Sequence, residues 1–209
     1  MVCLAGCSTF SSVGAGPALI VGNHAREAGL VATAAVGEGT SGVDCPDAPS
    51  PAWWPRAPCT IRGSTFTETR ARVLVARNHQ QLGGLAGLSR LTWVGPSFPL
   101  WTGAGIGLGV EHGDDHVFID AIGQAKLETG FVLHESSSTY SSDFWGGGQP
   151  TYPGDARRVR SRRLLTLGLT GDLDARFTRA PLGVVQFTVG LTDLAEDVSV
   201  ARPRVVRYR

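Results

Sequence analysis

The sequence is poor in lysine, in charged residues and in net charge. Among its 19 basic residues Lys126 is the single lysine, and the formal net charge at pH 7 is +1. Charged residues make up 18% of the chain, less than the roughly 25% of a typical soluble domain. Because no overall positive field would attract phosphates, we expect no nucleic-acid partner.

Long apolar helices are also lacking. Two stretches carry no charge, residues 1–25 and 91–110. The second contains Pro96, Pro99 and five glycines, which a membrane-spanning helix of about 20 residues tolerates poorly. No segment sustains an apolar repeat of 3.6 residues, and no spacing of cysteine and histidine matches a zinc site. The sequence therefore predicts neither a helical membrane protein nor a coiled coil, and we expect no cofactor.

A repeat of two residues dominates the chain instead. Between residues 65 and 77, one parity consists of Thr67, Thr69, Ala71, Val73 and Val75, and the other of Phe66, Glu68, Arg70, Arg72 and Leu74. Residues 117–134, 165–173 and 185–191 alternate in the same way. Such alternation is typical of strands with one apolar face.

The alternating runs predict about eight strands, near residues 27–39, 63–77, 82–95, 100–112, 116–134, 161–173, 183–193 and 198–208. Their connections alternate between long segments, such as 40–62 and 135–160, and tight turns. An even number of strands closes a sheet without edges. The predicted fold class is all-β, an antiparallel up-and-down β-barrel, and it resembles the small eight-stranded barrels of the bacterial outer membrane.

The faces leave two kinds of barrel open. In a soluble barrel or sandwich the apolar face is the core, whereas in a membrane barrel it meets lipid and the polar face fills the lumen with paired charges. Aromatic residues favour the membrane barrel, because they gather at the predicted strand ends as two belts. The upper belt is Phe66, Trp93, Phe98, Trp101, Phe131 and Trp145, and the lower belt is Phe118, Phe177 and Tyr208.

Four glycines alternate within the expected strand over 100–112. Gly103, Gly105, Gly107 and Gly109 share one parity, and they lack the spacing of a dinucleotide-binding loop. A glycine row within a strand either allows tight curvature or admits bulky neighbours. We expect this row to face the lumen.

The N-terminus resembles that of a bacterial lipoprotein. The run Leu4-Ala5-Gly6-Cys7 matches a lipobox, with only six residues before the cysteine. The resemblance implies that Cys7 is the acylated N-terminus of the mature protein. Residues 1–22 are then a truncated signal and linker, and residues 23–209 form a single barrel domain. A lipid in the inner leaflet would make the strand near 27–39 rise from the periplasm, with the long connections outside.

Two further cysteines, Cys45 and Cys59, flank a segment rich in proline. A disulfide between them would close a loop of about 15 residues and stabilise the fold by about 3 kcal/mol. Two unpaired thiols are the alternative. A bridge would place the chain outside the cytosol.

Three groups of residues are candidates for chemistry. His112, Asp114 and His116 lie at a tight turn and are weak candidates for a metal site. His134 and Ser136 resemble the His-x-Ser motif of lipid A deacylases, with Asp143 as a possible third member, although Ser137 and Ser138 replace the residues that follow in that family. Arg157, Arg158, Arg160, Arg162 and Arg163 form the single dense charge run, which suits phosphates of lipopolysaccharide.

Together these features predict an outer-membrane lipoprotein with a small transmembrane barrel and a structural or binding role. Its expected partners are membrane lipid, lipopolysaccharide and an envelope protein. One alternative is a soluble, lipid-anchored barrel or sandwich that binds an apolar ligand or an envelope partner. The other is a barrel lipid A hydrolase that uses His134 and Ser136; we favour a role other than catalysis.

Overall fold

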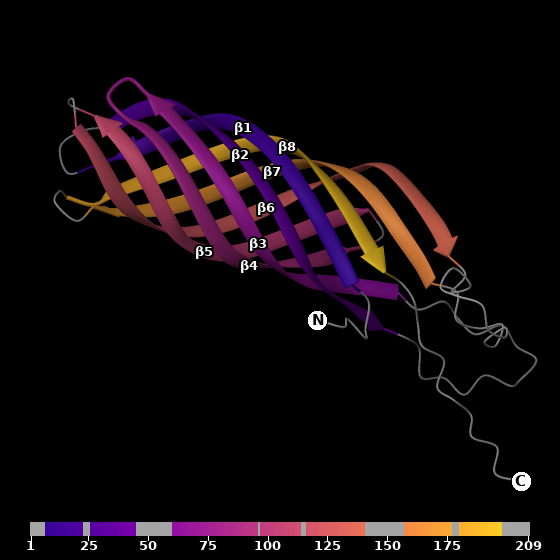
Figure 1. Cartoon of the computed structure of the whole chain (residues 1–209). Coiled ribbons are helices and arrows are strands. Elements are labelled where there is room, and N and C mark those ends of the chain that lie inside the picture. Colours follow the sequence, from indigo (N-terminus) through magenta and orange to yellow (C-terminus); the bar gives the residue numbers. More distant parts are fainter. Residues whose placement is uncertain are drawn as a thin grey trace, which may run out of the picture.

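Eight antiparallel strands make up the part of the chain that the computed structural model describes, which is residues 7–22, 26–44, 60–95, 97–113, 116–140, 157–176 and 180–197. The strands follow one another in chain order (Figure 1). Their bounds are β1 Cys7–Val21, β2 Arg26–Asp44, β3 Thr60–Ala76, β4 Gln80–Val94, β5 Phe98–Gly113, β6 His116–Tyr140, β7 Arg157–Arg176 and β8 Leu182–Asp197. No helix long and apolar enough to cross a bilayer occurs in these ranges.

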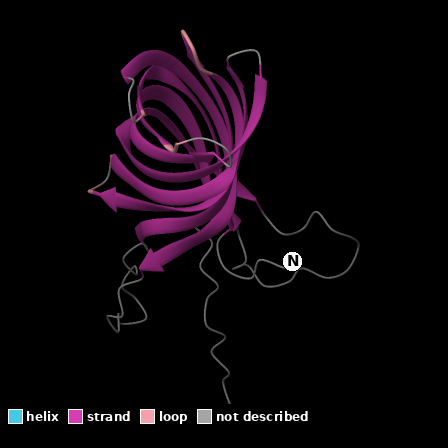
Figure 2. Ribbon diagram, turned by 90° about the vertical axis from the view of Figure 1, so that its left-hand side faces the viewer, coloured by secondary structure: helices cyan, strands magenta, loops and turns pink. Residues whose placement is uncertain are grey.

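The sheet closes on itself through pairing of β1 with β8 (Figure 2). The paired residues, followed once round the ring from Ser11, return to β1 at Val21, ten residues further on. This stagger makes the strands tilt by about 35–45° to the barrel axis. An eight-stranded barrel has an interior just wide enough for side chains to fill. The structure therefore confirms the predicted fold class and strand number.

The first strand lies where the sequence analysis placed a signal and linker. β1 covers Cys7–Val21, so the barrel begins well before residue 23. Small residues on both faces weaken the alternation of β1, and Pro17 argues against a central strand because it has no backbone N–H. Accordingly, the pairing of β1 with β8 has no partners for Gly16 and Pro17. The strand expected over 198–208 lies outside the described residues.

The extra strand also changes the expected orientation. Cys7 pairs with Thr40, and β2 then runs on to Asp44. Cys7 therefore lies at the same barrel end as the connections 45–59, 95–97 and 141–156, which we call the long-connection end. The opposite, tight-turn end has the connections 22–25, 77–79, 114–115 and 177–181. The barrel end at which Cys7 lies is therefore also the end of the long connections, contrary to the expectation.

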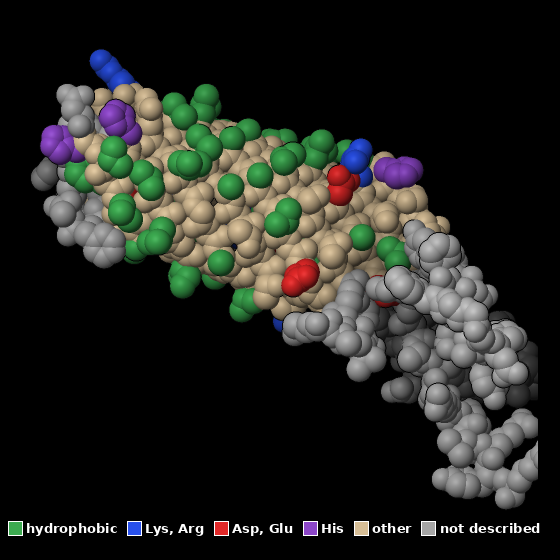
Figure 3. Space-filling view, in the orientation of Figure 1, with side chains coloured by type: hydrophobic (Ala, Val, Ile, Leu, Met, Phe, Trp, Pro, Cys, Tyr) green, Lys and Arg blue, Asp and Glu red, His purple; other side chains and the backbone are tan. Residues whose placement is uncertain are grey.

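The two faces of the wall differ sharply in chemistry. Large apolar side chains point outward from every strand, and Ile106 on β5 is 77% exposed (Figure 3). Charged side chains point inward, and Arg72 and Asp120 are completely buried. The alternation in β3 has the predicted split, with Val73 and Val75 outside and Glu68, Arg70 and Arg72 inside.

The alternation of faces also shows that the expected upper aromatic belt is wrong in part. Phe66 and Trp101 are buried in the lumen rather than turned toward the outside, whereas Phe98 and Phe131 do point outward. The last two form an edge-to-face pair with ring centroids 6.1 Å apart. Trp145, Phe177 and Tyr208 lie outside the described residues. The belt is predicted from how far along its strand each aromatic residue lies. Whether a ring contacts lipid or the lumen depends instead on the face of the strand to which it points.

Candidate functional site

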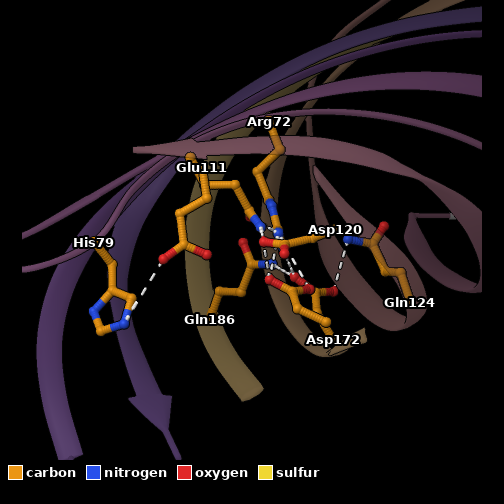
Figure 4. Close-up of polar contacts among 9 residues, drawn as sticks. Arg72, His79, Glu111, Asp120, Gln124, Asp172 and Gln186 are labelled. Carbon is orange, nitrogen blue, oxygen red and sulfur yellow. Dashed lines mark hydrogen bonds and ion pairs between the residues drawn. The ribbon is translucent and has the colours of Figure 1, made fainter. Parts of the chain in front are cut away.

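A network of buried polar side chains fills the lumen toward the tight-turn end. Arg72 on β3 donates hydrogen bonds to Asp172, to Asp174 at 3.2 Å and to Gln81 (Figure 4). Gln81 in turn donates to Asp174 at 2.9 Å and to Asp120 at 3.0 Å. One guanidinium thus lies among three buried aspartates drawn from β6 and β7.

Amide side chains complete this layer. Gln124 on β6 donates to Asp172 at 2.9 Å, and Gln186 on β8 donates to the other oxygen of the same carboxylate (Figure 4). Side chains from β3, β4, β6, β7 and β8 therefore meet in one hydrogen-bonded layer. Buried charges need such partners, because an unpaired charge away from water is very costly.

A second charged layer lies nearer the long-connection end. The Nζ of Lys126 donates to Glu68 at 2.5 Å, and the Ser89 hydroxyl donates to the same oxygen at 2.6 Å. Arg70 Nη2 lies 3.2 Å from Glu128 and 3.6 Å from Glu68. Two cations thus face two carboxylates here, as the sequence predicted for a lumen filled by paired charges.

The glycine row makes room for this layer. Gly103 faces the lumen beside Lys126, and a Cβ added at Gly103 would lie 2.7 Å from the lysine Cε. Gly109 lies against Gln81 and Ile122 in the same way. The row therefore faces the lumen as expected. Gly103 and Gly109 admit bulky side chains, whereas a Cβ at Gly105 or Gly107 would meet the backbone of β4, so these two glycines let the strands approach closely.

Aromatic rings close the lumen above the second charged layer. The rings of Phe10, Phe66 and Trp101 pack together with centroids 5.0 to 5.3 Å apart. Ala35, Leu91, Leu164 and Leu194 complete this cluster, which we call the aromatic plug. The ammonium of Lys126 lies 5.8 Å from the Phe10 ring and 5.9 Å from the Trp101 ring, within range of a cation–π contact.

An ion-pair cluster covers the aromatic plug at the long-connection end. The Cζ of Arg162 lies over the Trp93 ring, 4.0 Å from its centroid, and Arg162 bonds Glu135 at 2.9 Å and Glu196 at 3.3 Å. Glu196 also accepts hydrogen bonds from Trp93 and Ser64. At the tight-turn end, His79 contacts Glu27 at 2.8 Å and Glu111 at 3.8 Å. Polar clusters thus lie at both ends of the filled lumen.

A polar hollow lies on the outer wall near the long-connection end. The strand register places two rows of side chains side by side across β1, β8, β7 and β6. One row is Ser11, Asp193, Arg163 and His134, and the next is Thr9, Ala195, Ser161 and Ser136. They line a pocket of about 540 Å³, which we call the wall notch. Figure 3 shows a basic, an acidic and a histidine side chain together on this part of the wall.

An ion pair occupies the middle of the wall notch. Arg163 donates two hydrogen bonds to Asp193, from Nε at 2.7 Å and from Nη2 at 3.1 Å. Both side chains are more than half exposed, at 59% and 55%. Both charges can therefore be reached from outside the barrel.

The predicted site residues fall on different sides of the wall. His134 and Ser136 point outward into the wall notch, whereas Asp143 lies outside the described residues. In the arginine run, Arg160 bonds Glu135 at 3.2 Å, Arg162 is buried, and Arg163 is on the outer wall. The side chains of Arg157 and Arg158 are not described.

The two histidines expected to bind metal flank one tight turn but are not register partners. Both His112 and His116 are exposed, and the register pairs His112 with Val117 and His116 with Gly113. Asp114 lies outside the described residues, as do Cys45 and Cys59. Within the described ranges, no three His, Cys, Asp or Glu side chains are arranged to hold a metal ion.

Comparison with known proteins finds likeness in structure alone. No protein-family model matches the chain, and no curated protein matches it in sequence. Neisserial surface protein A is similar at a TM-score of 0.45 and 8% identity, covering 88% of this chain and 95% of that one. The outer membrane enzyme PagL is similar at 0.42 and 11%, covering 87% and 97%. The β domain of the Bordetella autotransporter Brka is similar at 0.40 and 11%, covering 92% and 99%.

Sequence reasoning missed Asp193 as the partner of Arg163. The two residues are 30 positions apart and meet only through the register of β7 with β8. It also missed the link from Glu27 through His79 to Glu111, which joins residues near three different tight turns. Each of these contacts depends on which strands are neighbours, and local sequence patterns carry little of that information.

Proposed function

We propose that this protein is an outer-membrane β-barrel with a filled lumen and a structural or binding role in the bacterial envelope. The observation that carries this proposal is that the wall presents large apolar side chains, while the interior holds layers of buried charges beside two apolar clusters. In lipid the apolar wall is the favourable surface, and backbone groups are satisfied because the sheet is closed.

The soluble alternative fits this arrangement poorly. In water the apolar face of a barrel forms its core, yet Leu30, Ile106 and Val117 are each at least 68% exposed. Soluble monomers rarely expose apolar patches of more than a few hundred Å². In a soluble protein, aspartates and arginines are placed at lower free-energy cost on the hydrated surface than buried as pairs inside a barrel.

The filled lumen favours a structural or binding role over diffusion of solutes. The aromatic plug and both charged layers occupy the space that a channel would need. Surfaces for binding are then the two ends and the outer wall. Binding of an envelope protein, or of lipopolysaccharide at the arginine run, stays a prediction. Among the arginines of that run whose side chains are described, Arg163 is the one on the outer wall.

Membrane extraction tests the proposal directly. We expect the full chain to stay in the membrane fraction after an alkaline wash, because its apolar wall is anchored in lipid. In detergent we expect a gel shift on heating, since a closed barrel keeps its compact form until it is boiled. Release by alkali, or folding in buffer without detergent once residues 1–7 are removed, would contradict a membrane barrel.

We also propose that Cys7 is acylated, on the strength of the lipobox residues Leu4 to Cys7. Cys7 begins β1 at the long-connection end. If its lipid lies in the inner leaflet, the long connections face the periplasm and the tight turns face outward.

A disulfide between Cys45 and Cys59 is our second covalent proposal. β2 ends at Asp44 and β3 begins at Thr60, and these two residues are partners in the register. Paired residues of antiparallel strands have Cα atoms about 4.5–5.5 Å apart, which falls within the range that a disulfide spans. The register thus brings the flanks of both cysteines together.

Intact mass measured without reductant tests both covalent proposals. We expect a mature protein that begins at a diacylglyceryl-modified Cys7. In a trypsin digest without reductant, we expect the peptides 27–56 and 57–62 to be joined through Cys45 and Cys59. An unmodified Met1 would eliminate acylation, and alkylation of Cys45 and Cys59 before reduction would eliminate the bridge.

A lipid A hydrolase is the second candidate function, and the wall notch is the observation that favours it. His134 and Ser136 share this hollow on the lipid-facing wall, where an acyl ester can approach a nucleophile and its base. This candidate needs the long-connection end to face outward, so it excludes an inner-leaflet lipid on Cys7. Under this hypothesis, overexpression yields lipid A species that lack one acyl chain, and His134→Ala or Ser136→Ala abolishes them. Ser161→Ala, in the same notch but outside the motif, is the matched control. An unchanged lipid A profile on overexpression would eliminate the hydrolase.

A further inference from the structure

The wall notch lies where the outer wall changes from apolar to polar. Directly below the row of Ser11, Asp193, Arg163 and His134, the register places a row of four apolar residues, namely Val13, Leu191, Leu165 and Phe131. The change takes two residues along β1, β8 and β7, and three residues along β6, where the register shifts between Val132 and His134. A molecule that fits both rows has an apolar body and a polar head.

The charges of the notch define that polar head. Arg163 has five N–H donors, and two of them bond Asp193. Three donors are left for an acceptor such as a phosphate oxygen. The Asp193 carboxylate has about four acceptor positions, and Arg163 occupies two, so it can also accept from an ammonium. The head therefore carries one negative and one positive charge.

The rest of the notch suits the phosphate. His134 is the neighbour of Arg163 in the register, and the hydroxyls of Ser161 and Ser136 lie in the adjoining row. These side chains can donate hydrogen bonds, and a guanidinium beside them is well suited to bind a phosphate. A head with a phosphate alone would face the Asp193 carboxylate without a partner for it. A quaternary ammonium would bring charge to Asp193 but no N–H to donate.

We propose that the wall notch binds the headgroup of a phospholipid that carries a phosphate and a primary ammonium, as in phosphatidylethanolamine. Arg163, with His134 and the two serines, binds the phosphate, and Asp193 binds the ammonium. The acyl chains lie on the row of Val13, Leu191, Leu165 and Phe131. This inference rests on the proposed function, since it needs the apolar wall to lie in a bilayer.

Native mass spectrometry of the full chain in a mild detergent tests the inference. The probe is an equimolar mixture of phosphatidylethanolamine, phosphatidylcholine and phosphatidylglycerol with identical acyl chains. We expect the wild type to retain one phosphatidylethanolamine about two- to fivefold more often than either other lipid, which is the effect of one solvent-exposed ion pair.

Three variants assign the preference to the notch. Asp193→Asn should retain phosphatidylethanolamine no more often than phosphatidylcholine, because the acceptor for the ammonium loses its charge. Arg163→Gln should retain less of all three lipids. Arg90→Gln should behave as wild type, because Arg90 is an exposed arginine on β4 whose register partners are Thr65 and Thr102.

The result that overturns the inference is distinct from failure of the membrane barrel. If the wild type shifts on heating but retains the three lipids equally, the notch does not select this headgroup. The same follows if neither Asp193→Asn nor Arg163→Gln alters the retained lipids. If the protein instead leaves membranes on alkaline washing, the proposed function itself is wrong.

Discussion

Replacing Arg72 by methionine should lower the free energy of unfolding by about 3–5 kcal/mol, the cost of breaking a buried ion pair by removing one partner. Arg72 is completely buried and bonds Asp172, Asp174 and Gln81. Without it, three buried aspartates lie in one layer with no cation. Methionine keeps most of the volume, so the loss reports charge more than packing.

Urea titration in detergent micelles measures this effect, with the unheated gel mobility of the barrel as the signal of folding. Arg163→Met is the matched control, because it removes an arginine from an exposed ion pair on the outer wall, and its midpoint should stay close to that of the wild type. Equal losses for the two variants would mean that water enters the lumen freely and screens the aspartates. If Arg72→Met does not fold, Arg72→Lys keeps a cation and should recover part of the stability.

Local alternation predicted most of the strands, because every strand except β1 has one clearly apolar face. Val73 and Val75 alternate with Arg70 and Arg72, and this alternation predicts both the strand and which side chains face the wall or the lumen. The same parity also places Phe66 on the side of Glu68, so its burial in the aromatic plug follows from residues already in view. The upper belt is wrong because it depends only on how far along its strand each aromatic residue lies, and not on the face to which the ring points.

β1 shows where alternation fails as a signal. Its lumen-facing positions include Ser8, Gly14 and Gly16, which leave space for neighbours rather than fill it. A Cβ at Gly16 would clash with the backbone carbonyl oxygen of Phe187 and lie 3.1 Å from the Cα of Thr188, so the close approach of β8 selects glycine there. This steric constraint comes from β8, which is far away in the chain, so the sequence of β1 itself shows little alternation.

β1 reverses the orientation expected for the barrel. With strands counted from residue 27, Cys7 would lie opposite the first long connection, but β1 brings it to the same end. The wall notch likewise depends on closure, because Ser11 and Asp193 are neighbours only where β1 meets β8. Contacts that close the ring are the ones that local patterns leave undetermined.

Ile106→Arg should destabilise the barrel by about 2–4 kcal/mol, the cost of an arginine on the lipid face at the middle of a bilayer. Ile106 is eight residues after Phe98 and seven before Gly113, so it lies midway along β5. Its side chain is 77% exposed and extends from the wall between Ala86 and Gly123. In water, an arginine at so exposed a site would be hydrated and would change stability by less than about 0.5 kcal/mol.

Val117→Arg is the matched control, because it introduces the same charge on the outer wall but near the end of the barrel. Val117 is 68% exposed and is the second residue of β6, at the tight-turn end. Near an interface the same substitution costs about 0–1 kcal/mol, so urea midpoints in phospholipid vesicles should fall far more for Ile106→Arg than for Val117→Arg. Equal and small losses would show that water, not lipid, surrounds the middle of the wall, which would exclude the membrane barrel even if the lipid on Cys7 were found. A large loss confined to Ile106→Arg places the middle of β5 in hydrocarbon, because depth in the bilayer is the property that distinguishes two outward-facing, exposed apolar side chains.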